Sequence, residues 1–137
     1  MKIVIAGGKA KADYLIRLLN GKGHQLIVIN DDLEFCTYLS QAHQIPVVHG
    51  DPCKLYVLDE ANIEDGDVII ALKAADADNL AICQTAKRLY RVKKTVAVVG
   101  NPTSNKGKGA EVGKQVVELL QEAGRKHGFN VIDVTGE

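Results

Sequence analysis

The chain has 137 residues, enough for one domain with a buried core. Lys and Arg number 17, as do Asp and Glu, so the formal net charge is zero and no basic field favours nucleic acid or an anionic membrane. No apolar run approaches the roughly 20 residues of a membrane span. The three cysteines form no C-x-x-C pair, which favours reduced thiols in a cytosolic protein over disulfides or a zinc site.

Short β-branched runs alternate with helical patterns along the whole chain. The patterns predict strands over residues 2–6, 25–30, 46–49, 67–72, 95–99 and 130–134. They predict helices over residues 10–20, 33–42, 53–60, 76–90 and 108–126. Several strands are continuous apolar runs, typical of a sheet covered on both faces. We therefore expect one α/β domain over residues 1–137, with a doubly wound, Rossmann-like parallel sheet of six strands in the order 3-2-1-4-5-6.

Local signals mark the ends of these helices. Asp32 stands where an N-cap belongs, three residues before Phe35. Asp76 or Asp78 is expected to start the fourth helix, and Gly124 or Gly128 to end the last. The predicted apolar face of the fourth helix includes Leu80, Ile82, Ala86 and Leu89.

The first strand–helix turn reads Gly7-Gly8-Lys9-Ala10-Lys11-Ala12. A dinucleotide fingerprint, G-x-G-x-x-G, uses its glycines for a tight turn, for close approach of the pyrophosphate and for helix–strand packing. Gly7 meets the first requirement, and Ala12 is a mild replacement at the third. Lys9 stands at the second, where its ammonium group either attracts phosphates beside a helix N-terminus or points to water.

The second predicted strand ends with Asn30, followed by Asp31 and Asp32. A ribose-binding acid belongs at this strand end, roughly 20 residues after the glycine loop. Asn30 takes that place, and its amide is able to bond a ribose hydroxyl less strongly than a carboxylate would. The two aspartates would repel a 2′-phosphate, which disfavours NADP, and at least one of them caps the following helix.

Residues 1 to about 102 resemble the Trk/Ktr-type RCK (KTN, TrkA-N) regulatory domain of potassium channels and transporters. The resemblance is carried by several segments: Lys2-Ile3-Val4-Ile5-Ala6-Gly7-Gly8, Lys22-Gly23-His24, Val28-Ile29-Asn30, His49-Gly50-Asp51-Pro52, the run from Leu58 to Asp67, and Asp78-Asn79-Leu80. It implies a nucleotide-binding regulatory domain rather than an enzyme. The ligand would be an adenine nucleotide, NAD(H) or ATP, ADP or AMP.

The same resemblance assigns roles to individual residues. Gly7, Gly8, Asn30, Asp31, Gly50 and Asp51 would line the nucleotide site, with Lys9 beside the phosphates. Asp51 would lie near the base and Asn30 near the ribose. The resemblance further implies a homodimer on the cytoplasmic side of a membrane potassium transporter subunit.

The tail departs from that family. The segment Asn101-Pro102-Thr103-Ser104-Asn105-Lys106-Gly107-Lys108-Gly109 resembles the phosphate loop of a diacylglycerol or lipid kinase, although Asn105 replaces a glycine and the G-G-D-G-T motif is absent. The hypothesis that follows is a hybrid, with a Trk-like body over 1–102 and a lipid-kinase-like helix and last strand over 103–137. A natural Trk-type gene with an unusual tail is the alternative.

Two rival functions stay open at this point. The first is an engineered chimeric scaffold with weak or no ligand binding. The second is an NAD-dependent oxidoreductase, for which Tyr90 and Lys94 spell a Y-x-x-x-K motif. That motif needs both residues one helical turn apart, whereas Tyr90 ends a predicted helix and Lys94 enters a strand. No catalytic residue and no metal-ligand spacing among the four histidines is predicted.

Overall fold

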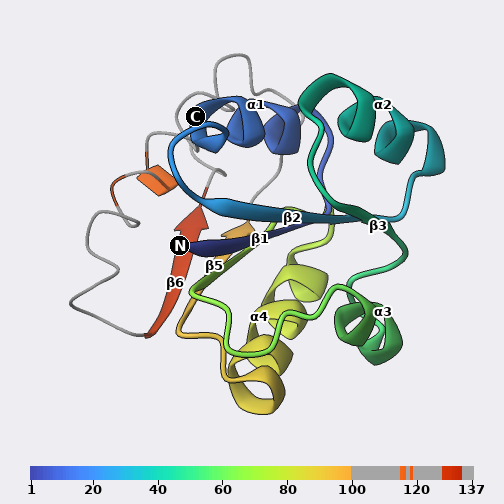
Figure 1. Ribbon diagram of the computed structural model, residues 1–137. Helices are drawn as coiled ribbons and strands as arrows, with labels where there is room; N and C mark the ends of the chain where they lie inside the picture. Colours follow the sequence, from blue (N-terminus) through green and yellow to red (C-terminus); the bar gives the residue numbers. More distant parts are fainter. Residues whose placement is uncertain (100–114, 117, 119–127, 134–137) are drawn as a thin grey trace.

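The computed structural model describes residues 1–99, 115, 116, 118 and 128–133. Within these residues, six parallel strands form one sheet in the order β3-β2-β1-β4-β5-β6 (Figure 1), which confirms the predicted fold class. The strands are β1 Lys2–Ala6, β2 Gln25–Asn30, β3 Val47–His49, β4 Val68–Ala71, β5 Lys94–Val99 and β6 Gly128–Asp133. The helices are α1 Ala10–Leu19, α2 Leu33–His43, α3 Leu55–Glu60 and α4 Asp76–Tyr90.

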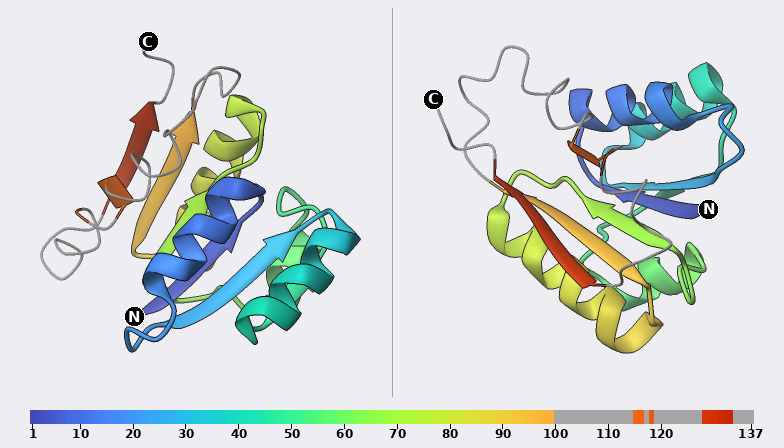
Figure 2. Two further views of the ribbon diagram at one scale, coloured as in Figure 1. Left: turned by 90° about the horizontal axis from the view of Figure 1, so that it is seen from above. Right: turned by 90° about the vertical axis from the view of Figure 1, so that its left-hand side faces the viewer.

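Helices cover both faces of the sheet. Helices α1 and α2 lie on one face and α3 and α4 on the other (Figures 1 and 2). Alternate residues of β1 supply the two cores: Ile3 and Ile5 pack with α1, and Val4 and Ala6 pack with α3 and α4. Because successive residues of β1 are buried on opposite faces of the sheet, the strand is a continuous apolar run in the sequence.

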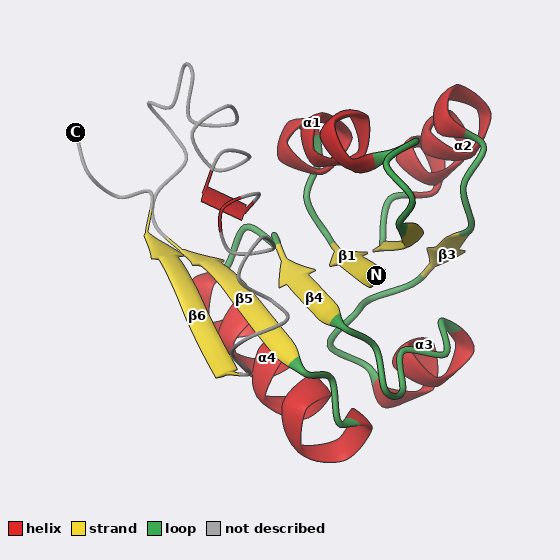
Figure 3. Cartoon of the chain, turned by 60° about the vertical axis from the view of Figure 1, so that its left-hand side comes forward, coloured by secondary structure: helices red, strands yellow, loops and turns green. Residues whose placement is uncertain are grey.

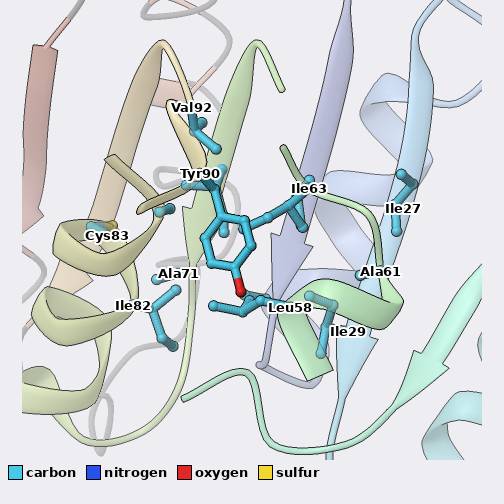
Figure 4. Close-up of a cluster of buried hydrophobic side chains, with 14 of the residues drawn as sticks. Ile27, Ile29, Leu58, Ala61, Ile63, Ala71, Ile82, Cys83, Tyr90 and Val92 are labelled. Carbon is cyan, nitrogen blue, oxygen red and sulfur yellow. The ribbon is translucent and has the colours of Figure 1, made fainter. Parts of the chain in front are cut away.

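The core under α3 and α4 contains one large polar-tipped side chain, Tyr90. Its ring lies among Leu58, Ile63 and Val92 (Figure 4), and 9% of the residue is exposed. The hydroxyl donates to Asp59 Oδ1 at 2.6 Å, and burial together with this carboxylate raises the pKa of Tyr90 to about 12. Tyr90 therefore closes this core at the end of α4, as a buried tyrosine with a hydrogen-bonded hydroxyl does.

Some predicted boundaries differ from the structure. Gly128, expected as a stop for the last helix, is instead the first residue of β6, which pairs with β5 at the edge of the sheet (Figure 3). Leu80 and Leu89, expected on the apolar face of α4, are 41% and 62% exposed, whereas Ile82 and Ala86 are fully buried. The buried face of α4 is therefore rotated relative to the predicted one, and it consists of Asn79, Ile82, Cys83, Ala86 and Tyr90.

The predicted helix over 108–126 and the lipid-kinase-like loop over 101–109 lie outside the described residues, apart from three positions. Residues 115, 116 and 118 are helical, and Val116 is buried in the core that contains α1. In the part of the chain that the structure describes, every helix is too short or too polar to cross a membrane.

Candidate functional site

Two glycines make the turn between β1 and α1. Gly7 and Gly8 have φ angles of 83° and 90°, the left-handed region that favours glycine. The Gly7 amide donates to the Ile29 carbonyl at 2.7 Å, which ties the turn to β2. A Cβ on Gly7 would lie 2.6 Å from Lys73 Cγ, and one on Gly8 would lie 2.9 Å from Leu72 Cβ. The turn is therefore sharp and lies directly against the segment after β4.

Helix α1 begins at this turn without a side-chain cap. Lys9 occupies the N-cap position and makes no capping hydrogen bond, whereas Asp32 caps α2 by accepting from the Phe35 amide at 3.0 Å, as predicted. The first-turn amides of a helix carry a partial positive charge that attracts anions. The Lys9 side chain is 64% exposed, and its ammonium pairs with Asp32 through a hydrogen bond that raises the pKa of Lys9. Lys9 thus links the first two strand–helix turns.

Asn30 holds these turns together from beneath. It is 1% exposed, its Nδ2 donates to the Gly8 carbonyl at 2.8 Å, and its Oδ1 accepts from the Asp32 amide at 3.0 Å. Its own carbonyl accepts from the Gly50 amide at 2.8 Å. Both ends of the side-chain amide are therefore occupied within the chain, so the structure assigns Asn30 a positioning role.

The turn after β3 brings Gly50 and Asp51 to the same edge of the sheet. A Cβ on Gly50 would lie 2.7 Å from Val57 Cγ2, so α3 approaches the turn closely. Asp51 Oδ1 accepts from the Cys53 amide at 2.9 Å and from Lys73 Nζ at 3.1 Å. The backbone hydrogen bond from Cys53, and after it Lys73, lower the pKa of Asp51. Asp51 is consequently ionised at neutral pH.

Lys73, which the sequence reasoning did not single out, is the central charge of this edge. Its ammonium lies 3.1 Å from Asp51, 3.4 Å from Asp31 and 3.9 Å from Asp78, and its side chain is 16% exposed. Burial opposes its charge, but the hydrogen bond to Asp51 and the nearby carboxylates outweigh burial and raise the pKa of Lys73. The available signal was position: Lys73 follows a fully buried strand at the carboxyl edge.

Asn79 fixes the backbone of Lys73. It is fully buried, its Oδ1 accepts from the Lys73 amide at 2.7 Å, and its Nδ2 donates to the carbonyls of Lys73 at 2.8 Å and Val98 at 2.6 Å. The Asp78-Asn79-Leu80 segment was singled out in the sequence, but not this function. The amide locks the turn after β4 to the end of β5.

Cys53 lies beside Asp51, and Tyr90 and Lys94 are the residues of the Y-x-x-x-K motif. Partial desolvation and the charge of Asp51 raise the pKa of the nearby Cys53 thiol to about 11, so Cys53 is not a reactive thiolate. Tyr90 ends α4 and Lys94 opens β5, so both lie toward the amino ends of the strands. What the carboxyl edge offers is a glycine turn, a helix N-terminus and carboxylates around one ammonium.

Relatives of the chain belong to potassium uptake systems. The Trk system potassium uptake protein TrkA homolog of Methanothermobacter thermautotrophicus is 31% identical over 102 residues, covering 74% of this chain and 47% of that protein. TrkA of Mycobacterium tuberculosis is 28% identical over 134 residues, covering 90% of this chain and 59% of that protein. The chain thus spans less than two thirds of the length of these curated relatives.

Solved structures of the GsuK channel share the fold. The channel bound to NAD aligns with a TM-score of 0.66 and 27% identity, over 96% of this chain and 21% of that chain. The structure of GsuK bound to ADP aligns with a TM-score of 0.65 and 27% identity, over 96% of this chain and 31% of that chain. The sequence profile of the TrkA-N domain matches residues 3–108. This chain therefore belongs to the TrkA-N domain family.

Proposed function

We propose that the chain is a nucleotide-binding regulatory domain of a potassium uptake or channel system, which binds an adenine nucleotide without turning it over. The observation that carries the proposal is the α1 N-terminus, which has no side-chain cap and follows two positive-φ glycines. It lies at the same end of the sheet as Asp31 and Asp51, the carboxylates that pair with Lys73. Family membership supports it, and so do the NAD and ADP in the titles of the GsuK structures. NAD(H), ATP, ADP and AMP are the candidate ligands.

The described residues fit such a ligand. Gly7 and Gly8, with the first-turn amides of α1, would hold the phosphates, and Lys9 would add a cation beside them. Asn30 was expected near the ribose, but its side-chain amide is bonded within the chain, so Asp31, 57% exposed and paired with Lys73 at 3.4 Å, would take the ribose hydroxyls. Asp51 would lie near the base. Gly50 permits the close turn that presents Asp51. The nucleotide would supply only charge and shape, because the role proposed here is recognition.

The proposed setting is the cytoplasmic side of a membrane potassium transporter subunit. It is supported by the Trk uptake proteins that match the chain and by the GsuK channels that contain the same fold. We also propose a homodimer, for which the exposed Leu80 and Leu89 on α4 offer apolar surface. Size-exclusion chromatography with light scattering tests this: Leu89→Lys is expected to shift a dimer toward monomer, and a wild-type monomer would contradict the dimer.

For residues 103–137 two interpretations are kept. One is the lipid-kinase-like end of a hybrid, and the other is a natural Trk-type tail. The alignment with Mycobacterium tuberculosis TrkA extends over 90% of this chain, and the TrkA-N match continues to residue 108, both of which favour the natural tail. A natural parent gene with an uninterrupted reading frame through residues 95–137 would exclude the hybrid.

Thermal unfolding with and without millimolar NADH, ATP, ADP and AMP tests the proposed function. A ligand at 100 times its dissociation constant adds roughly 2.7 kcal/mol to the free energy of unfolding, which is visible as a higher Tm. Asp51→Ala should remove the shift, and Glu60→Ala, an exposed carboxylate on α3, should keep it. No shift with any nucleotide would leave a folded scaffold without a ligand, and hydride transfer from NADH to a substrate would indicate an oxidoreductase.

A further inference from the structure

The side chain of Lys73 crosses the carboxyl edge of the sheet. It starts after β4 and reaches Asp31 after β2 and Asp51 after β3, and β1 lies between β4 and β2 in the sheet. Its stem lies over the glycine turn, because Lys73 Cγ would be 2.6 Å from a Cβ on Gly7. One ammonium group therefore occupies the space shared by the glycine turn and the two carboxylates.

We propose that Lys73 determines the specificity of the site: its charge makes the site bind phosphorylated adenine nucleotides in preference to neutral adenosine. This inference rests on the proposed function and deepens it. In the free protein the Lys73 ammonium pairs with the carboxylates. When the ligand binds, the side chain rotates and the ammonium pairs with the phosphates instead.

The charges around Lys73 give the first reason. Three carboxylates, Asp31, Asp51 and Asp78, face this single ammonium within 4 Å, so the surroundings of Lys73 are anionic overall. Phosphates entering beside these carboxylates meet repulsion unless a cation compensates it. Both lysines are paired in the free protein, but the Lys9 side chain is far more exposed, at 64% against 16% for Lys73, so solvent screens its charge more strongly. Lys73 is therefore the better-placed cation for a phosphate.

The occupied carboxylates give the second reason. Asp31 and Asp51 are the groups proposed for ribose and base, and in the free protein both face the Lys73 ammonium. A neutral nucleoside that takes these carboxylates leaves the partly buried ammonium with Asp78 alone, at 3.9 Å, and this loss of close partners is costly. A phosphorylated ligand offers the same ammonium a new anionic partner. The cost falls on adenosine and is offset for ADP.

The backbone of Lys73 stays fixed during such an exchange. Asn79 bonds both the amide and the carbonyl of Lys73, so the turn after β4 is held while the side chain rotates. The stem already lies against Gly7, next to the N-terminus of α1. Side-chain rotation alone therefore suffices to redirect the ammonium group.

Isothermal titration calorimetry of the full chain with ADP and with adenosine tests the inference. Lys73→Met keeps the stem over Gly7 and removes the charge. We expect it to weaken ADP binding by about tenfold or more, the worth of one hydrogen bond to a charged group, while adenosine binding is unchanged or tighter. Lys73→Arg should largely restore the preference for ADP.

Lys22→Met is the matched control, since Lys22 is an exposed lysine between α1 and β2 at the opposite edge. It should leave both affinities unchanged. Circular dichroism and Tm check folding, and Lys73→Gln replaces a misfolded Lys73→Met. If the wild type binds ADP and the uncharged variant keeps the same ratio of adenosine to ADP affinity, the inference is wrong while the proposed function stands. If neither ligand binds wild type or variant, the inference is wrong, and the proposed function fails with it only where NADH, ATP and AMP also leave the Tm unchanged.

Discussion

The carboxyl ends and the amino ends of the strands form two opposite edges of the sheet, here called the carboxyl edge and the amino edge. Both carry ion pairs, but the pairs are built differently. At the carboxyl edge Lys73, 16% exposed, faces three carboxylates. At the amino edge Arg91, 65% exposed, pairs with Glu64 at 2.6 Å and Asp65 at 3.0 Å, whose side chains are 53% and 65% exposed. One edge holds a half-hidden cation among excess acids, and the other holds solvated pairs.

The two edges also differ in the hydrogen bonds that hold their segments in place. At the amino ends of the strands, Asp67 joins two strands through their main-chain amides: the Lys2 amide donates to Asp67 Oδ2 at 2.8 Å, and the Lys94 amide donates to the Asp67 carbonyl at 3.0 Å. At the carboxyl edge two buried side-chain amides, Asn30 and Asn79, hold the turns. Charges held by buried amides suit recognition, whereas solvated pairs contribute little to stability.

Removing Asn79 should have the largest effect. Asn79→Ala deletes three hydrogen bonds of 2.6–2.8 Å at a fully buried position and leaves their backbone partners unpaired. We expect the free energy of unfolding in urea to fall by about 3 kcal/mol. Asn20→Ala, whose amide makes one exposed hydrogen bond to His43 at 3.3 Å, is the control and should cost much less. Equal losses in the two variants would contradict the assigned role.

The Asp67→Asn variant should lose less stability in acid than the wild type does. The backbone amide of Lys2, and after it Lys93, hold the pKa of Asp67 below its ordinary value of 3.8. A carboxyl with a depressed folded pKa stabilises the fold above its unfolded pKa, and this contribution disappears as pH falls through the folded value. The decrease in Tm between pH 7 and pH 3 should therefore be smaller in the variant than in the wild type.

Asp51→Asn makes the same comparison at the other edge. The pKa of Asp51 is also lowered, first by the backbone amide of Cys53, so this variant too should lose less stability in acid. The two variants should differ in one respect, since only Asp51→Asn alters nucleotide-induced shifts in Tm at pH 7. An Asp67→Asn variant that lost those shifts while folding normally would break the distinction between the edges.

Much of the fold was predictable from the sequence, because burial on both faces makes a parallel strand apolar throughout. Apolar runs such as Val68 to Ala71, alternating with helical segments, predicted a parallel sheet, and the order 3-2-1-4-5-6 is that of the Rossmann-like fold class. The exposed Leu80 and Leu89 were not predictable, since leucine supports either a core or a surface position on a helix. A buried polar residue, Asn79, rotated the face away from them.

The site was predictable only in part. Motif positions placed Gly7, Gly8 and Asp51 at one edge, and the structure brings them there. The side chain of Asn30 makes hydrogen bonds to the Gly8 carbonyl and the Asp32 amide. These bonds could not be predicted from spacing, because they depend on how two turns meet. Lys73 escaped for the same reason: its partners come from three different elements. The sequence indicates which turns lie at the carboxyl edge, whereas tertiary packing decides which side chains pair with one another there.

The smallest effect is expected for Arg91→Ala. Both of its ion pairs are solvated, so Tm should change by no more than about 2 °C, and added salt should reduce even that difference. Arg91 is also the C-cap residue that follows α4, with a φ of 56°, a left-handed conformation that costs alanine as much as arginine.

Arg91→Gly separates these two contributions. It removes the same ion pairs but relieves the left-handed strain, so its Tm should exceed that of Arg91→Ala and match or surpass the wild type. If Arg91→Gly instead unfolded well below Arg91→Ala, the pairs with Glu64 and Asp65 would not explain the residue. The amino edge would then depend on the arginine side chain in the way the carboxyl edge depends on its buried amides.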